Sequence, residues 1–124
     1  MMQSGTQAYH QISARSEIEG ASPHRLIQLM MERVVTKVAL SEKFMAQESV
    51  AEKGVHIGDA ISLIDGLQVS LNHKPGESMA SNFDALYEYM KRRLLEANIK
   101  NDVSILKEVS GLMKELKSAW DAIE

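Results

Sequence analysis

Histidine and acidic side chains have the clearest potential for chemistry in this chain, because the sequence contains no cysteine. A dimetal carboxylate site in a helical bundle needs inward-facing Glu-x-x-His pairs, and no such pair occurs. Glu52 and His56 come closest; they are four residues apart beside an apolar stripe, which is typical of an exposed i,i+4 pair. His10, His24 and His73 fall in a predicted arm, a first helical turn and a loop. The pattern therefore predicts no metal site.

The sequence also lacks the motifs of nucleophilic and phosphate chemistry. It has no Gly-x-Ser-x-Gly elbow and no glycine-rich loop before Lys-Ser or Lys-Thr. Acidic residues are spread over predicted helix surfaces, where they favour solubility and i,i+4 pairing. We therefore expect a protein that is not an enzyme and that uses no cofactor. A metal-dependent bundle enzyme is the weakest alternative.

The charge of the chain argues against a nucleic-acid partner. The formal net charge is -3, whereas phosphate binding needs a positive field. Lys91, Arg92 and Arg93 form the only basic cluster, and adjacent helical residues point about 100° apart. We interpret the cluster as a solvated helix face, except that the stem of Arg93 lies near enough to cover apolar surface.

Four amphipathic helices are predicted to position these side chains. The first begins with Ser22 as N-cap and Pro23 in the first turn and runs to about residue 47, and the second follows a Ser49/Glu52 capping box to about residue 72. A Pro-Gly turn precedes the third helix, from about Ser81 to near residue 98, with Ser81 or Asn82 as cap. The third helix has the clearest stripe, formed by Phe83, Leu86, Tyr87, Met90, Leu94 and Ala97.

The fourth helix is predicted to follow a cap at Asn101 or Asp102. Its apolar stripe consists of Val103, Leu106, Val109, Met113, Leu116, Trp120 and Ile123. Short connections favour antiparallel neighbours, so the expected fold is an all-α, antiparallel up-down four-helix bundle over residues 21–124. Residues 1–20 hold few apolar side chains and are expected to form a mobile arm or short extra helix.

The location follows from what the sequence does not contain. The first residues lack the basic end and apolar run of a secretory signal, and no apolar stretch approaches ~18 residues. We therefore expect a cytosolic protein without membrane insertion.

Several apolar residues fall outside or at the edge of the predicted stripes: Leu63, Val69, Tyr89, Leu95, Ile105 and Leu112. One interpretation is that the stripes are wide and these residues are core margins. The other is a hydrophobic groove that accepts an amphipathic helix from a partner. The sequence leaves both open.

Four landmarks recur in order along the chain: Ala8-Tyr9, residues 21–27 (Ala-Ser-Pro-His-Arg-Leu-Ile), a motif from Tyr87 to Asp102, and Ala119-Trp120 three residues after Leu116. Through these landmarks the chain resembles the FliS family of flagellar secretion chaperones over about residues 8–120. The resemblance implies a bundle that binds the disordered C-terminal segment of flagellin, which becomes helical in hydrophobic grooves of the chaperone.

By this resemblance, an N-terminal arm bearing Tyr9 and Ile12 covers part of the groove and moves when flagellin arrives. An export-gate component or a regulatory protein is a further partner left open, and so is a homodimer, whose alternative function would be a self-associating structural bundle. The candidate flagellin-binding residues are Tyr9, Ile12, Leu63, Leu67, Leu71, Tyr87, Tyr89, Met90, Arg93 and Leu95.

Overall fold

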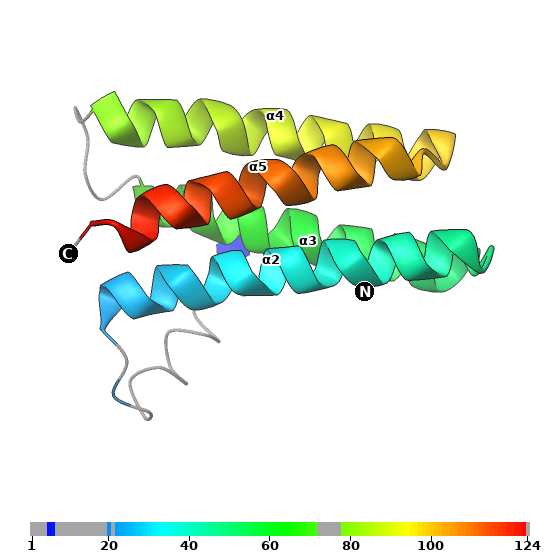
Figure 1. Cartoon of the computed structure of the whole chain (residues 1–124), viewed down its shortest axis with the longest axis horizontal. Coiled ribbons are helices and arrows are strands. Elements are labelled where there is room, and N and C mark those ends of the chain that lie inside the picture. Colours follow the sequence, from blue (N-terminus) through cyan, green and yellow to red (C-terminus); the bar gives the residue numbers. More distant parts are fainter. Residues whose placement is uncertain (1–4, 7–19, 21, 72–77, 124) are drawn as a thin grey trace.

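The computed structural model is a bundle of four long helices lying side by side (Figure 1). It describes residues 5–6, 20, 22–71 and 78–123, apart from the side chains of residues 78 and 79. The helices are α2 (Pro23–Ala46), α3 (Val50–Leu71), α4 (Ser78–Lys100) and α5 (Val103–Asp121). Most of the predicted arm, including Tyr9 and Ile12, lies outside the described residues.

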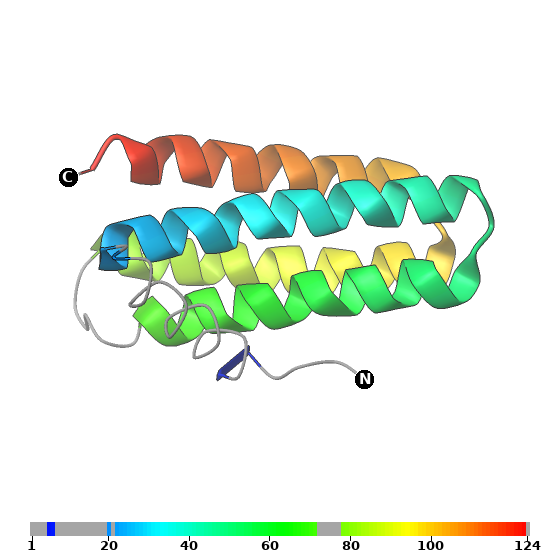
Figure 2. The same cartoon turned by 90° about the horizontal axis from the view of Figure 1, so that it is seen from below.

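Consecutive helices run in opposite directions, as the two views show (Figures 1 and 2). Each helix packs against two others, in the ring α2, α3, α4, α5 and back to α2. The described part of the chain contains no strand. The predicted all-α, antiparallel four-helix bundle is therefore confirmed. None of the described helices combines the length and apolar content of a membrane span.

The apolar stripes meet in one core along the bundle axis. Leu63 and Ile105, predicted to lie off their stripes, are buried in it, and Leu112 packs against it, so these three are core margins. Val103 was predicted to lie on the stripe of α5 but is exposed. The reason is its position, because the first residue of α5 lies at the end of the bundle, beyond the cover of the neighbouring helices.

Two predicted helix starts are confirmed by their caps. The Ser22 hydroxyl accepts a hydrogen bond from the backbone N–H of Arg25 at 3.1 Å. A carboxylate oxygen of Asp102 accepts one from the N–H of Ser104 at 2.9 Å. Both caps satisfy first-turn N–H groups that have no partner within their helix.

The predicted boundaries of α4 were wrong by a few residues at both ends. The helix begins at Ser78, so Ser81 and Asn82 lie inside it and are exposed rather than capping. Serine and asparagine tolerate exposed helical positions at small cost, which is why they mark a helix start ambiguously. The helix continues to Lys100 because Asn101, with φ of 52°, adopts the left-handed conformation that ends a helix.

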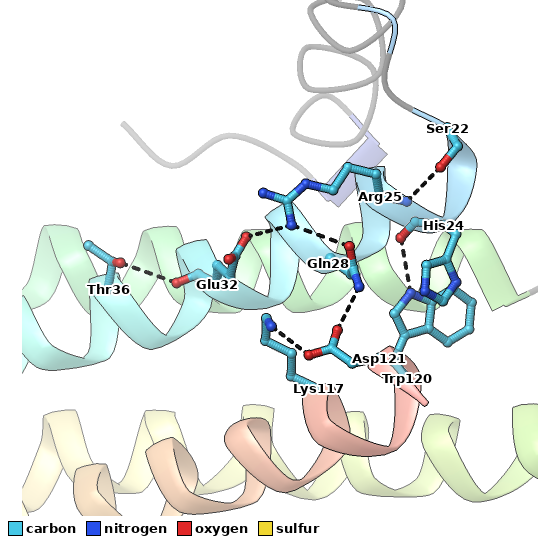
Figure 3. Close-up of polar contacts among 9 residues, drawn as sticks. All are labelled: Ser22, His24, Arg25, Gln28, Glu32, Thr36, Lys117, Trp120 and Asp121. Atoms are coloured by element: carbon cyan, nitrogen blue, oxygen red, sulfur yellow. Dashed lines mark hydrogen bonds and ion pairs between the residues drawn. The ribbon is translucent and has the colours of Figure 1, made fainter. Parts of the chain in front are cut away.

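The start of α2 and the end of α5 are joined by side-chain contacts (Figure 3). The Trp120 indole N–H donates to the carbonyl oxygen of His24 at 3.0 Å, and the two rings stack with centroids 4.7 Å apart. Gln28 donates to Asp121 at 2.7 Å, and Lys117 pairs with the same carboxylate. The Lys117 ammonium, followed by the amide of Gln28, lowers the pKa of Asp121.

Candidate functional site

Four of the ten candidate flagellin-binding residues lie below the surface in this conformation. Leu63, Leu67, Tyr87 and Met90 are buried in the core, and Leu71 is half-buried against it. Burial also raises the pKa of the Tyr87 hydroxyl far above its usual range. These side chains pack in the core between the helices. A partner can therefore reach Leu63, Leu67, Tyr87 and Met90 only if helices separate.

Tyr89 and Arg93 belong to a polar network that joins α4 to α5. The Tyr89 hydroxyl donates to Glu108 at 2.6 Å, and Arg93 Nε donates to the other oxygen of the same carboxylate at 2.8 Å. Arg93 also pairs with Glu96 at 2.6 Å, while the guanidinium of Arg92 lies 5.8 Å from the centre of the Tyr89 ring. The Tyr89 hydroxyl and then Arg93 lower the pKa of Glu108. Arg93 thus ties two helices together through its charge.

The seam between α3 and α4 carries a second polar network. Lys91 pairs with Asp65 of α3 at 2.7 Å and with Glu88 at 3.0 Å. Gln68 donates to Glu88 at 2.9 Å and to Asp84 at 3.0 Å. The interpretation of residues 91–93 as a solvated face was therefore wrong for Lys91, which is half-buried in an interhelical pair, and right for exposed Arg92. Helix periodicity alone does not show which neighbour faces a charged residue.

Lys53 is a buried cation that sequence reasoning missed. The residue is 4% exposed, and its ammonium donates to the carbonyl oxygen of Asn98 at 3.0 Å and to the amide oxygen of Asn101. This places a positive charge at the C-terminal end of α4, where the helix dipole favours cations. The signal was present in the sequence, because Lys53 lies four residues before Ile57 on the apolar stripe.

A shallow pocket of about 340 Å³ lies at this end of the bundle. Its lining comes from the end of α2, the start of α3, the connection between them and the α4–α5 turn: Phe44, Met45, Glu48, Ser49, Val50, Lys53 and Asn101. The turn and the connection each contain a residue in the left-handed region, Asn101 and Glu48, with φ of 52° and 57°.

The five large apolar side chains that are exposed in the described chain all lie near this same end. They are Val50 (68% exposed), Val55 (53%), Leu95 (53%), Ile99 (81%) and Val103 (41%), and we call them the loop-end apolar surface. Of these, only Leu95 was among the candidate residues. Ile99 was missed because the third helix was predicted to end before it, which hid its place on the outward face of α4.

The predicted exposed Glu52–His56 pair was wrong for His56. Its ring is half-buried and stacks on Phe44 of α2 with centroids 5.3 Å apart, and its Nδ1 atom is buried without a hydrogen-bond partner. The side chain packs across the seam between α2 and α3, which a single helix stripe does not reveal. Among the residues that the structure describes, no group of three metal-ligating side chains comes together.

Comparison with known proteins adds to this geometry. Residues 5–124 match the family model described as flagellar protein FliS. The chain is 47% identical to the flagellar secretion chaperone FliSB of Pseudomonas aeruginosa over 115 residues, which cover 93% of this chain and 91% of that protein. It is 39% identical to the flagellar secretion chaperone FliS of Salmonella typhimurium, with 97% and 90% covered, and 29% identical to that of Bacillus subtilis, with 86% and 78% covered. An all-helical bundle matched over nearly its whole length by this model belongs to the FliS family of flagellar proteins.

Proposed function

We propose that this protein is a cytosolic secretion chaperone that binds the C-terminal segment of flagellin. By covering that segment it prevents premature polymerisation and keeps flagellin competent for flagellar type III secretion. The observation that carries the proposal is the family membership, with relatives named flagellar secretion chaperones that align over most of their length. The loop-end apolar surface supports it, because a binding protein needs exposed apolar side chains.

The proposed mechanism is stoichiometric binding without chemistry. A disordered segment that folds on a chaperone pays an ordering cost, which apolar burial must offset. Leu71, Tyr89, Arg93 and Leu95 are at least partly exposed and can meet flagellin directly. Buried Leu63, Leu67, Tyr87 and Met90 contribute only if helices shift, whereas Tyr9 and Ile12 remain proposed parts of an arm that yields to flagellin.

Binding measurements with two forms of flagellin test this function. Isothermal titration of the full chain with intact flagellin is expected to give a one-to-one complex, and flagellin lacking its C-terminal segment is expected to give no heat of binding. Equal binding to both forms, or to neither, contradicts the proposal.

Sedimentation of the chain alone tests the alternative of a self-associating bundle. The proposed chaperone is expected to sediment as a monomer that exposes its apolar surface to flagellin. A stable dimer that does not bind flagellin would instead favour the structural bundle. An export-gate component or a regulatory protein remains a proposed further partner, to be tested by adding it to the preformed flagellin complex.

A further inference from the structure

Among the helices that the structure describes, α4 has the narrowest buried face. Its buried apolar side chains follow one another at four- and three-residue steps, which is the strict spacing of a coiled-coil seam. They are Phe83, Tyr87, Met90, Leu94 and Ala97. Each of the other three helices buries an adjacent pair, which widens its contact with the core: Met30 with Met31 in α2, Leu63 with Ile64 in α3, and Ile105 with Leu106 in α5. The attachment of α4 therefore depends more on its two edges.

Both edges of α4 are polar. Lys91 pairs with Asp65 of α3 at 2.7 Å, and Arg93 pairs with Glu108 of α5 at 2.8 Å. The four side chains are 20–40% exposed, so water and dissolved salt reach them. Ion pairs that remain in contact with water contribute little to stability and are screened by salt. The edges of α4 are therefore easier to open than its buried stripe.

The α3 edge also brings together two like charges. Asp84 and Glu88 lie one turn apart on α4, and carboxylates at this spacing destabilise a helix. The Gln68 amide of α3 donates to Asp84 at 3.0 Å and to Glu88 at 2.9 Å, so one neutral side chain bridges both. These bonds lie in the first half of α4 and supply no positive charge to balance the pair.

The other end of α4 is fixed more firmly. The buried Lys53 ammonium donates to the carbonyl oxygen of Asn98, in the last turn of α4, and to the side chain of Asn101. Hydrogen bonds from a charged donor are stronger than those from a neutral amide. Any movement of α4 relative to the bundle is therefore expected to pivot at this end.

We propose that α4 opens away from α3 and α5 as a hinged unit, with its pivot at Lys53 and the α4–α5 turn. The other three helices stay packed, because α2 contacts both α3 and α5. Such a local opening needs less free energy than unfolding of the whole bundle. It uncovers four side chains that the closed bundle hides: Tyr87 and Met90 on α4, and Leu63 and Leu67 on α3. The opening is a property of the chain alone and does not depend on flagellin.

Native-state amide exchange of the full chain, without flagellin, tests the hinge. An undocked helix of this length is marginal in water, so its amides exchange once α4 opens. The amides of residues 83, 87 and 90 are expected to share one opening and to exchange at least tenfold faster than those of residues 30, 34 and 38 in α2, with residue 97 slower than residue 90. Equal exchange in α2 and α4, or fast exchange confined to residue 83, refutes the proposal.

Substitutions of Gln68 test whether the α3 edge controls the opening. Gln68→Ala removes both bonds and is expected to speed exchange at residues 83, 87 and 90 at least threefold, with α2 unchanged. Gln68→Lys places an ammonium between Asp84 and Glu88 and is expected to slow exchange there at least threefold. Gln28→Ala is the matched control: Gln28 is also half-buried and donates across the α2–α5 seam to Asp121, so α4 is expected to be unaffected.

The Gln68 variants are expected to keep the helical circular dichroism signal, because the side chain lies at the edge of the bundle and not in its core. If Gln68→Ala speeds exchange in all four helices alike, the residue acts on global unfolding and the proposal is wrong. The proposal is also wrong if Gln68→Lys does not slow exchange in α4, or if Gln28→Ala changes α4 as much as Gln68→Ala does.

Discussion

At the scale of single residues, Lys53 joins two elements at the end of the bundle that carries the α4–α5 turn. Its ammonium supplies a donor to the Asn98 carbonyl and to the Asn101 side chain, and thus holds α3 against the α4–α5 turn. Lys53→Met keeps most of the buried stem but leaves both acceptors without this donor. We expect a loss of about 2 kcal/mol in the free energy of unfolding, measured by urea denaturation.

Lys107→Met is the control for that substitution. Lys107 is exposed on α5, so the same chemical change there is expected to alter the free energy of unfolding by less than about 0.5 kcal/mol. Equal stability of the Lys53 and Lys107 variants would show that the buried hydrogen bonds of Lys53 make no net contribution to the free energy of unfolding.

Residue patterns predicted burial along a helix better than contacts between helices. The stripe of α4 gave Phe83, Tyr87 and Met90 as one buried face, and all three are in the core. The stack of His56 on Phe44 and the pairing of Arg93 with Glu108 were not predicted. Periodicity is a property of one helix, whereas these contacts depend on the rotation of a second one.

At the scale of elements, glycines show how the same substitution can have opposite effects. Gly111 lies inside α5, and a Cβ atom built on it meets nothing within 4 Å. We expect Gly111→Ala to raise the free energy of unfolding by about 0.5–1 kcal/mol, because alanine restricts the unfolded chain and favours the helix. Thermal unfolding followed by circular dichroism measures this gain.

Gly5 is expected to behave in the opposite way. A Cβ atom there would come within 2.1 Å of Asp65 Cβ and 2.7 Å of the Gly66 nitrogen, both on α3. Gly5→Ala is therefore expected to displace residues 5–6 from α3, seen as faster amide exchange at residues 65–66, with the helical circular dichroism signal unchanged. Unaltered exchange at those amides would show that Gly5 does not pack on α3 in solution.

Helix identity was predictable from sequence, and helix ends were less so. Ser22 with Pro23, and Asp102, gave strong start signals, because a cap combines a side-chain acceptor with a suitable backbone. The start of α4 had several polar residues that could cap, and its end was hidden because Asn98 remains helical while Asn101 takes the left-handed conformation. That shift moved Ile99 from a predicted link onto the exposed face of α4.

At the scale of the whole molecule, the bundle is a ring of four seams, and several seams are joined by ionisable groups. Hydrogen bonds from Gln68 and Lys91 lower the pKa of Glu88 in the α3–α4 seam, and those from Tyr89 and Arg93 lower the pKa of Glu108 in the α4–α5 seam. The sequence predicted which helices are neighbours, through the short connections, but not these charge pairs. The stability of the fold is therefore linked to pH in a way that only the assembled ring reveals.

The sign of that linkage follows from the direction of the pKa shifts. A carboxyl group with a lowered pKa stabilises the fold above its ordinary pKa of 4.5, and this stability is lost as pH falls below that value. Buried Tyr87 acts on the other side, because its raised pKa means that the unfolded chain ionises first and stability falls as pH rises above 10.0. We expect the melting temperature to be level between these limits and to fall beyond each.

Glu108→Gln tests how much of the loss of stability below pH 4.5 comes from one carboxyl group. The amide keeps the shape of the side chain but does not titrate. The variant is expected to be less stable than the wild type at neutral pH, where it lacks the ion pair with Arg93, and to lose less stability as pH falls below 4.5. The melting temperatures of the variant and the wild type should therefore converge as pH falls. Glu115→Gln, an exposed residue of the same helix, is the control and should follow the wild type throughout. Parallel curves for Glu108→Gln and the wild type would show that the α4–α5 network has no part in the acid sensitivity of the bundle.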